Sequence, residues 1–308
     1  MGELGVMLAD ANGWPELLPF VFECAASGRE PLMTSALAVL SDLAAYATDA
    51  LRPGLAQVHA LLGACLGHAS LEVALGALSA VANLIQALDE AAERGAFQDL
   101  VGPMLSTLGR ALTAGDTASA QEALEVLIEV AESDPRFLRK QLDQVVGAML
   151  SVAGADELED SVRTLAAEFL VTLCEARDKA PGMMRKLPAF PAKLFEVLMV
   201  FLLDVEDAPL WHGGDSDAHE EEGHSEKFDY AQECLDRLSL SLGGTAIVPA
   251  AGQLLPAWLG DADWRKRHAA LICLAQIAEG CAKVMSSQLP VLTDMCVKGL
   301  ADPHPKAR

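Results

Sequence analysis

The sequence predicts an all-α protein in which antiparallel helix pairs stack into an α-solenoid, a right-handed superhelix. Three observations support this fold class. Hydrophobic residues make up 52% of the 308 positions but aromatic residues only 5%, which disfavours β-sandwiches and barrels, whose strands favour Tyr, Phe and Trp. Apolar residues recur at helical spacing almost throughout, in blocks of 14 to 20 residues. The blocks occur in pairs, and the pairs recur along the chain.

The interval between the pairs identifies the kind of repeat. Successive openings of the second helix in each pair lie 39, 46, 42, 69, 36 and 40 residues apart. Five of these six intervals lie near the ~40–47-residue period of HEAT and armadillo repeats. We therefore expect a single HEAT-repeat array over residues 1–308, with about six and a half helical hairpins. The expected openings are Pro31, Ser70, Asp116, Leu158, Lys227, Asp263 and Pro303.

Charged residues in the turns favour HEAT repeats. Asp261 precedes Arg267 by six residues, and Asp302 precedes Arg308 by six. We expect each Asp to accept hydrogen bonds from the Arg on the helix that follows it. Because residues 3–9 resemble the end of an earlier helix and Arg308 stands at the opening of another, we also expect a piece of a longer solenoid.

The interval of 69 residues contains an insertion, residues 204–226, with nine acidic residues and no Lys or Arg. Its glycines and Pro209 disfavour a long helix, so we predict a mobile acidic loop on the side of the turns within hairpins. Its acidic side chains are candidate partner-binding residues: Asp204, Glu206, Asp207, Asp215, Asp217, Glu220, Glu221 and Glu222.

A second acidic feature is expected on a helix face. Four glutamates follow the spacing i, i+3, i+7, i+10, which places them within an arc of about 80°, opposite the apolar residues of the same helix. Glu168 and Glu175 lie seven residues apart on the second helix of the next hairpin. Second helices line the concave, binding surface of α-solenoids, so these six glutamates are also candidate partner-binding residues, although a solvated polar face would look the same. The first four are Glu122, Glu125, Glu129 and Glu132.

Composition excludes several classes of function. With 22 basic and 44 acidic residues the net charge is −22, which disfavours nucleic-acid binding and favours basic partners. The sequence carries none of the common nucleotide-binding, hydrolase or metalloprotease motifs, so we expect no enzyme. The uncharged stretch 238–260 is interrupted by Gly243, Gly244 and two prolines, which predicts two helix ends rather than a membrane span. Seven cysteines without a CxxC pair suit a reducing compartment.

The histidines of the insertion, His212, His219 and His224, are the one candidate metal set. Imidazole and carboxylate groups suit divalent ions, but a metal site needs ligands fixed by a scaffold, which a glycine-rich loop does not provide. We therefore expect incidental histidines, with no metal and no cofactor. His268, inside a second helix, is expected to be a core or capping histidine rather than a ligand.

Two tracts resemble a known family. DWRKRHAALICLAQIAEGC from Asp263, preceded by CLDRLSLSLGG from Cys234, is similar to importin-β-type nuclear transport receptors (karyopherin-β), in the importin-5 or importin beta-3 branch. Shorter pieces of similarity begin at Asn12, Ile128, Leu165 and Asp302, so that the resemblance spans nearly the whole chain.

The resemblance implies an internal fragment of a monomeric carrier that shuttles between cytoplasm and nucleus. Such a carrier would bind basic nuclear-localisation-signal cargo, Ran-GTP and Phe-Gly nucleoporins. The insertion 204–226 resembles the family's acidic loop, which touches Ran and influences cargo release. The amino-terminal repeats that make the family's main contact with Ran, and the carboxy-terminal half, have no counterpart in this chain. A HEAT scaffold subunit of a multiprotein complex is the alternative, and a HEAT-like lyase is a weaker third hypothesis because no catalytic constellation supports it.

Overall fold

The computed structural model describes residues 16–176, 178–180, 182–184, 187, 189–212 and 223–308. Within these residues the regular structure is helical, apart from one isolated antiparallel bridge between Val205 and His224. The all-α prediction is therefore confirmed. The earlier helix expected over residues 3–9 lies outside the described residues.

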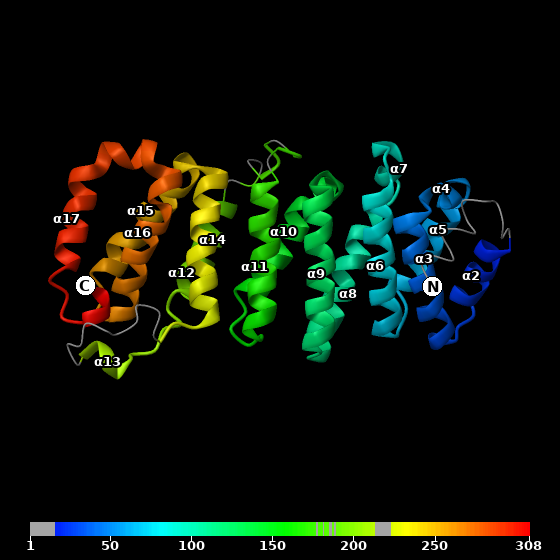
Figure 1. Ribbon diagram of the computed structural model, residues 1–308, viewed down its shortest axis with the longest axis horizontal. Coiled ribbons are helices and arrows are strands. Elements are labelled where there is room, and N and C mark those ends of the chain that lie inside the picture. The colour runs from blue at the N-terminus through cyan, green and yellow to red at the C-terminus, as the bar shows by residue number, and fades with distance from the viewer. Residues whose placement is uncertain (1–15, 177, 181, 185–186, 188, 213–222) are drawn as a thin grey trace. The chain divides into compact units, whose positions relative to one another are not determined.

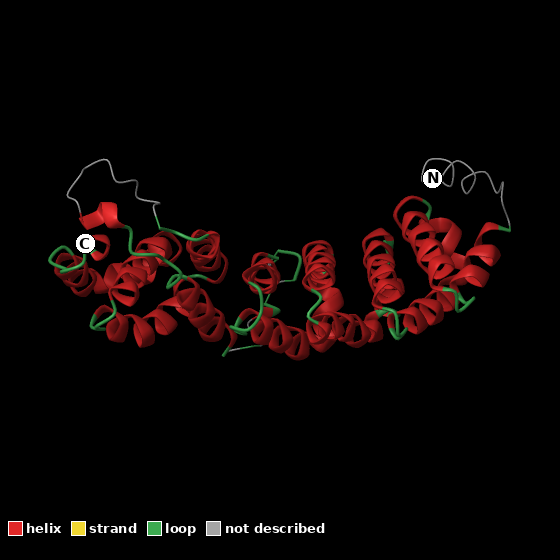
Figure 2. Cartoon of the chain, turned by 90° about the horizontal axis from the view of Figure 1, so that it is seen from below, coloured by secondary structure: helices red, strands yellow, loops and turns green. Residues whose placement is uncertain are grey.

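The chain divides into two compact units, residues 1–148 and 149–308. In the first unit three long helices lie side by side (Figure 1), and each packs against a shorter helix that precedes it in the chain, so that the unit has two layers (Figure 2). The layer of long helices consists of α3 (Glu30–Tyr46), α6 (Leu71–Ala87) and α9 (Thr117–Ser133). The layer of shorter helices consists of α2 (Leu17–Ala25), α5 (Leu55–Leu66) and α8 (Val101–Ala114). The short helices α4 (Thr48–Leu51) and α7 (Ala91–Gly95) lie in the connections.

The second unit repeats this arrangement. Its long helices are α11 (Asp160–Glu175), α14 (Glu226–Leu242) and α16 (Trp264–Met285), and its other helices are α12 (Phe190–Phe201), α15 (Gly244–Leu259) and α17 (Leu289–Gly299). Two short elements complete it, α13 (Pro209–His212) and the 3-10 turn η6 (Pro305–Ala307), while α10 (Leu142–Ala153) runs across the boundary.

Local sequence signals explain where the long helices begin. All six begin within two residues of the expected openings. Asp116 caps α9 by accepting a hydrogen bond from the Ser119 amide at 3.1 Å, directly after Gly115 ends α8 with a φ of +67°. Ser225 and Asp263 cap α14 and α16 in the same way, and Pro31 stands in the first turn of α3. Local signals of this kind therefore set four of the six starting points.

Apolar burial holds each unit together. In the first unit α6 contributes ten buried residues and packs between α3 and α9. In the second unit small residues permit close approach: Ala269 and Ala270 are fully buried on α16, and a Cβ added to Gly280 would lie 2.3 Å from the Ser239 hydroxyl of α14. The core therefore depends on shape as well as on hydrophobic area.

Gly243, with a φ of +77°, separates α14 from α15, so the predicted break in the uncharged stretch 238–260 is confirmed. The remainder is the whole of α15 rather than a helix end, because Pro249 and Pro256 lie inside that helix without ending it. One other stretch of the described residues, Trp264–Gly299, is long and apolar enough to span a membrane by length and composition. It comprises α16 and α17, which Figure 1 shows as two helices joined by a turn, and the core helix of a soluble protein passes the same test.

The expected aspartate–arginine pairs are present, but the acceptor in each is the backbone carbonyl of the Asp rather than its carboxylate. Arg267 donates to the backbone carbonyl of Asp261 at 2.9 Å, whereas its carboxylate partner is Asp302 in the following turn, at 2.6 and 2.8 Å. Arg308 likewise donates to the backbone carbonyl of Asp302 at 2.7 Å. The Asp302 turn therefore offers its carbonyl to its own hairpin and its carboxylate to the preceding one, whereas the Asp261 carboxylate accepts from Lys266 and the Asp263 amide of its own hairpin. The Arg267 guanidinium also holds the pKa of Asp302 below its usual value.

Candidate functional site

The four glutamates of α9 form an exposed acidic ridge, defined as Glu122, Glu125, Glu129 and Glu132. The opposite side of α9 is buried, with Leu124 and Leu127 at 0% exposure, so the amphipathic prediction for this helix is confirmed. Among the described residues no ion pair to Glu122, Glu125 or Glu129 is present within 4.0 Å. These three carboxylates are available to a ligand from solution.

The neighbouring helices extend the same charge. Glu30 and Asp42 on α3 and Glu72 on α6 are exposed, and none of α3, α6 or α9 contains a Lys or Arg. We call these three helices the acidic layer. Sequence reasoning found the ridge but missed Glu30, Asp42 and Glu72, because single acids on separate helices form no local pattern. The sequence does contain one indication of this layer: the second helix of each hairpin in this unit has no Lys or Arg.

Glu168 and Glu175 have a different environment from the ridge. Both lie on α11, and both pair with Arg237 of α14 through two hydrogen bonds each, all between 2.8 and 2.9 Å. The Tyr230 hydroxyl donates to Glu168 at 3.1 Å. These carboxylates connect two helices of the second unit, so they do not offer the same free charge as the ridge.

The two ends of the insertion are packed rather than free, which corrects the expectation of a mobile loop over the whole of 204–226. The Glu206 amide donates to the Gly223 carbonyl at 2.9 Å, and Trp211 of α13 contacts Trp264 edge-on at 6.0 Å. Asp204 accepts from Lys227 at 3.2 Å, and Glu206 is exposed. The remaining candidate acids, Asp215, Asp217, Glu220, Glu221 and Glu222, lie outside the described residues, as does His219.

Two of the three candidate histidines, His212 and His224, lie within the described residues, and each has its own carboxylate partner. His212 bonds Asp207 at 2.7 Å, while His224 bonds Asp229 at 3.2 Å. Hydrogen bonds from His212 and His304 hold the pKa of Asp207 below its usual value. His268 is buried in the core and stacks on Phe228, as expected for a core histidine; burial lowers its pKa to about 4.

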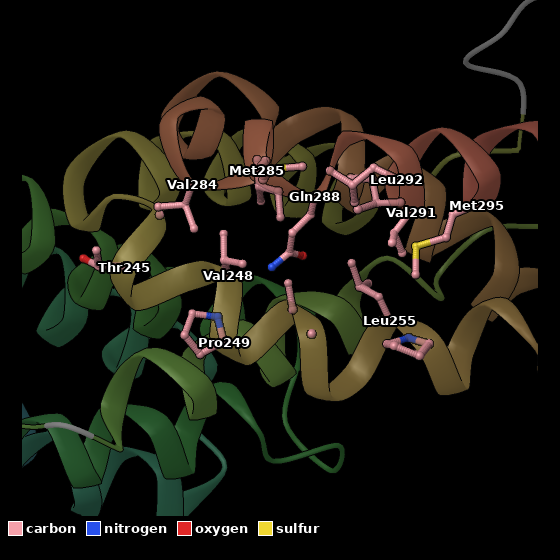
Figure 3. Close-up of a pocket in the computed structure, with 16 residues that line it drawn as sticks. Thr245, Val248, Pro249, Leu255, Val284, Met285, Gln288, Val291, Leu292 and Met295 are labelled. Atoms are coloured by element: carbon pink, nitrogen blue, oxygen red, sulfur yellow. The ribbon is translucent and has the colours of Figure 1, made fainter.

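Sequence reasoning also missed an apolar groove in the second unit. It lies between α15 and α17, has a volume of about 430 Å³, and is shown in Figure 3. Its labelled polar side chains are Thr245 and Gln288, and Val291 on its rim is 56% exposed. No sequence motif marks it, because it arises where two helices of successive hairpins diverge. Its apolar lining includes Val248, Leu255, Val284, Leu292 and Met295.

Comparisons with known proteins agree with this geometry. The family profile described as "IPO5-like, TPR repeats" matches residues 3–148, and the profile described as "Importin repeat" matches residues 155–249. Importin subunit beta-3 of Saccharomyces cerevisiae is 28% identical over 303 residues, and Importin-4 of Homo sapiens is 27% identical over 312 residues. These alignments cover 97% and 96% of this chain but 27% and 28% of the relatives, so the chain spans little more than a quarter of their length.

Solved structures give the same result. The structure of Kap121p bound to Nup53p and that of Kap121p bound to Pho4p each match with a TM-score of 0.84 and 27% identity. Each match covers 96% of this chain and 28% of the neighbour. The HEAT-repeat solenoid predicted from the hairpin period is thereby confirmed.

Proposed function

Because this chain belongs to the importin-β family of nuclear transport receptors, in the importin-5 branch, we propose that it is the part of an import receptor that holds basic cargo. The acidic layer is the cargo surface. The observation that carries this proposal is a layer of three helices with seven exposed acids and no basic residue, whereas Glu168 and Glu175 of the second unit pair with Arg237. Binding rather than catalysis is the proposed activity.

Electrostatics determine the kind of cargo signal that fits. The ridge spans ten residues of helix, or about 15 Å at 1.5 Å per residue. An extended peptide places successive side chains about 3.3 Å apart, so that alternate lysines over five or six residues would match the ridge. A lysine-rich nuclear-localisation segment lying along α9 therefore satisfies several carboxylates at once.

The peptide test uses a fluorescent lysine-rich localisation peptide and this 308-residue chain. Glu125→Lys with Glu129→Lys is expected to weaken the peptide at least about tenfold at low salt, since each lost contact becomes a repulsion. The control is Glu23→Lys with Asp143→Lys, which makes the same change in net charge at exposed positions outside the acidic layer. Equal loss in both variants, or none in the first, contradicts the assignment of the ridge as the cargo surface.

The insertion is proposed to contact Ran-GTP and to influence cargo release in the full-length receptor. Its packed ends support this role, because they fix the points between which the acidic segment runs. Replacing residues 213–222 with a Gly-Ser linker of equal length keeps both packed ends. The expected result is a change in Ran-driven release with little change in resting peptide affinity. Unchanged release rates would remove the insertion from the mechanism.

The groove between α15 and α17 is proposed to bind Phe-Gly nucleoporin segments. Its support is chemical: it is apolar, open at Val291, and of a size suited to a phenyl ring. Val291→Asp is expected to weaken a Phe-Gly peptide. Val297→Asp is the matched control, since Val297 lies on the same helix, is 57% exposed and does not line the groove. Equal effects of the two variants would argue against this location. A receptor with these three contacts would shuttle through the nuclear pore.

A further inference from the structure

Three side chains able to bind a metal meet where the insertion returns to the last hairpin. They are Asp207, His212 on α13, and His304 in the turn before η6; α13 and η6 pack together, as Figure 1 shows beside the C-terminus. His212 Nε2 and His304 Nε2 lie 2.7 and 3.3 Å from the same oxygen, Asp207 Oδ1. All three ligand atoms lie within 4.8 Å of one another. This set differs from the candidate set of the sequence, which we expected to be incidental, and it is independent of the proposed transport function.

We propose that Asp207, His212 and His304 form a binding site for zinc or a similar divalent transition ion. Two imidazoles and one carboxylate are a donor set that zinc accepts, with water completing a tetrahedron. At zinc–ligand bonds of about 2.1 Å, tetrahedral ligand atoms stand about 3.4 Å apart. The His304–Asp207 separation of 3.3 Å is close to this value, the His212–Asp207 separation of 2.7 Å is shorter, and the two imidazole nitrogens lie within 4.8 Å of each other, so an ion requires a shift of Asp207 or His212.

The structure supplies the scaffold whose absence disfavoured a metal site in the sequence. His304 is 11% exposed and stacks on Trp264 of α16, with ring centroids 3.8 Å apart and planes 5° apart. Trp211, next to His212 in α13, contacts the rings of both Trp264 and His304 edge-on. Packing by two tryptophans therefore restricts the direction from which the His304 imidazole reaches Asp207, and the His212 ring contacts the His304 ring edge-on at 5.3 Å.

Binding requires His304 to change tautomer, with no net loss of a ring proton. The His304 Nδ1 atom accepts a hydrogen bond from the Lys306 amide at 3.3 Å, which places the single proton of the neutral ring on Nε2, facing Asp207. When Nε2 binds the metal, that proton leaves Nε2 and another is taken up from solvent at Nδ1, so the ring stays neutral. The Lys306 amide then loses its acceptor. At 3.3 Å that hydrogen bond is at the long end of the usual range, so its loss opposes binding only weakly.

The described charge at the site has both signs. Lys306 lies over the Trp211 ring at 4.8 Å and is the nearby positive charge that opposes a metal, whereas Asp207 supplies a negative charge from within the site. A bound ion would fasten the base of the insertion, through Asp207 and His212, to the last hairpin through His304.

The test is a cobalt titration of the 308-residue chain after treatment with a chelator, followed by competition with zinc. A tetrahedral site is expected to give visible Co²⁺ absorption that zinc removes, and zinc is expected to raise the melting temperature. His212→Gln, Asp207→Asn and His304→Gln should each weaken cobalt binding at least about tenfold. His212 is 48% exposed, so His212→Gln tests the site without a change in the core.

Two controls separate this site from other histidines. His59→Gln alters a His–Asp pair of similar geometry, 2.8 Å from Asp99, that lacks a second imidazole, and it should leave the titration unchanged. His219→Gln and His224→Gln should also leave it unchanged. The proposal is wrong if micromolar cobalt and zinc produce neither absorption nor stabilisation. It is equally wrong if binding is lost with His219→Gln or His224→Gln but kept with His304→Gln.

Discussion

The long helices of the two units have similar acidity but very different basicity. In the first unit α3, α6 and α9 contain seven acidic residues and no Lys or Arg. In the second unit α11, α14 and α16 contain eight acidic and seven basic residues. The first set presents its charge to solvent, whereas the second uses its charge between helices, as in the Arg237 cluster with Glu168 and Glu175.

This difference separates two uses of an acidic residue on the same scaffold. Lys227 bonds Asp160 and Asp204, and Arg267 bonds Asp302, so basic residues of the second unit connect one hairpin with its neighbour. The first unit holds its long helices mainly by apolar contact, as the ten buried residues of α6 show. Glu122, Glu125 and Glu129, which make no ion pair among the described residues, remain available to a basic ligand.

The largest expected effect tests how closely the helices of each unit approach. Gly280→Ala places a Cβ 2.3 Å from the Ser239 hydroxyl and 2.4 Å from its backbone, so α14 and α16 must separate. We expect a loss of about 2–3 kcal/mol in the free energy of unfolding, measured by urea titration with circular dichroism.

Gly76→Ala in the first unit is the matched variant. Its added Cβ would meet Leu37 of α3 at an ordinary 3.4 Å, and alanine favours a helix over glycine by up to about 1 kcal/mol. We expect an unchanged or slightly raised stability. If both variants lose the same amount, the closer approach in the second unit is not what makes Gly280 necessary.

The next effect tests the ion pairs that join α11 to α14 in the second unit. Arg237→Leu leaves Glu168 and Glu175 without their shared cation in a partly buried position, and we expect a loss of about 2 kcal/mol at neutral pH. Adding Glu168→Gln and Glu175→Gln should restore part of the loss, because the repulsion between the two carboxylates is then removed. A triple variant as unstable as the single one would indicate that Arg237 acts through packing alone.

A smaller effect concerns acid. Because Arg267 lowers the pKa of Asp302 in the folded protein, the pair stabilises the fold above the unfolded pKa of about 3.9, and this contribution disappears as pH falls through the folded pKa. Asp302→Asn should therefore cost about 1 kcal/mol from pH 5 to 7 and progressively less below about pH 4. A cost that stays constant down to pH 2 would assign the effect to lost hydrogen bonds rather than to charge.

The sequence predicted the features that depend on neighbouring residues and missed those that depend on distant ones. Asp116, Asp263 and the α9 ridge each act within about three helical turns, so their spacing is visible in the chain. The partners of Arg237 lie 62 and 69 residues away. His304 meets Asp207 only because the last turn folds back onto the insertion. The spacing of residues along the sequence does not predict such contacts, because they depend on how one hairpin stacks on another.

The smallest expected effect concerns the stability of the ridge itself. Glu125 and Glu129 lie four residues apart on α9, where like charges repel by a few tenths of a kcal/mol. Glu125→Gln with Glu129→Gln should therefore raise the free energy of unfolding by about 0.3–0.5 kcal/mol at low salt. The gain should vanish at about 1 M salt, where the screening length is about 3 Å. The same variant should lose affinity for the lysine-rich peptide, so stability and binding should change in opposite directions. Opposite signs are the mark of a surface kept for a ligand rather than for the fold. A variant that loses stability instead would place the ridge among the structural charges, with those of the second unit.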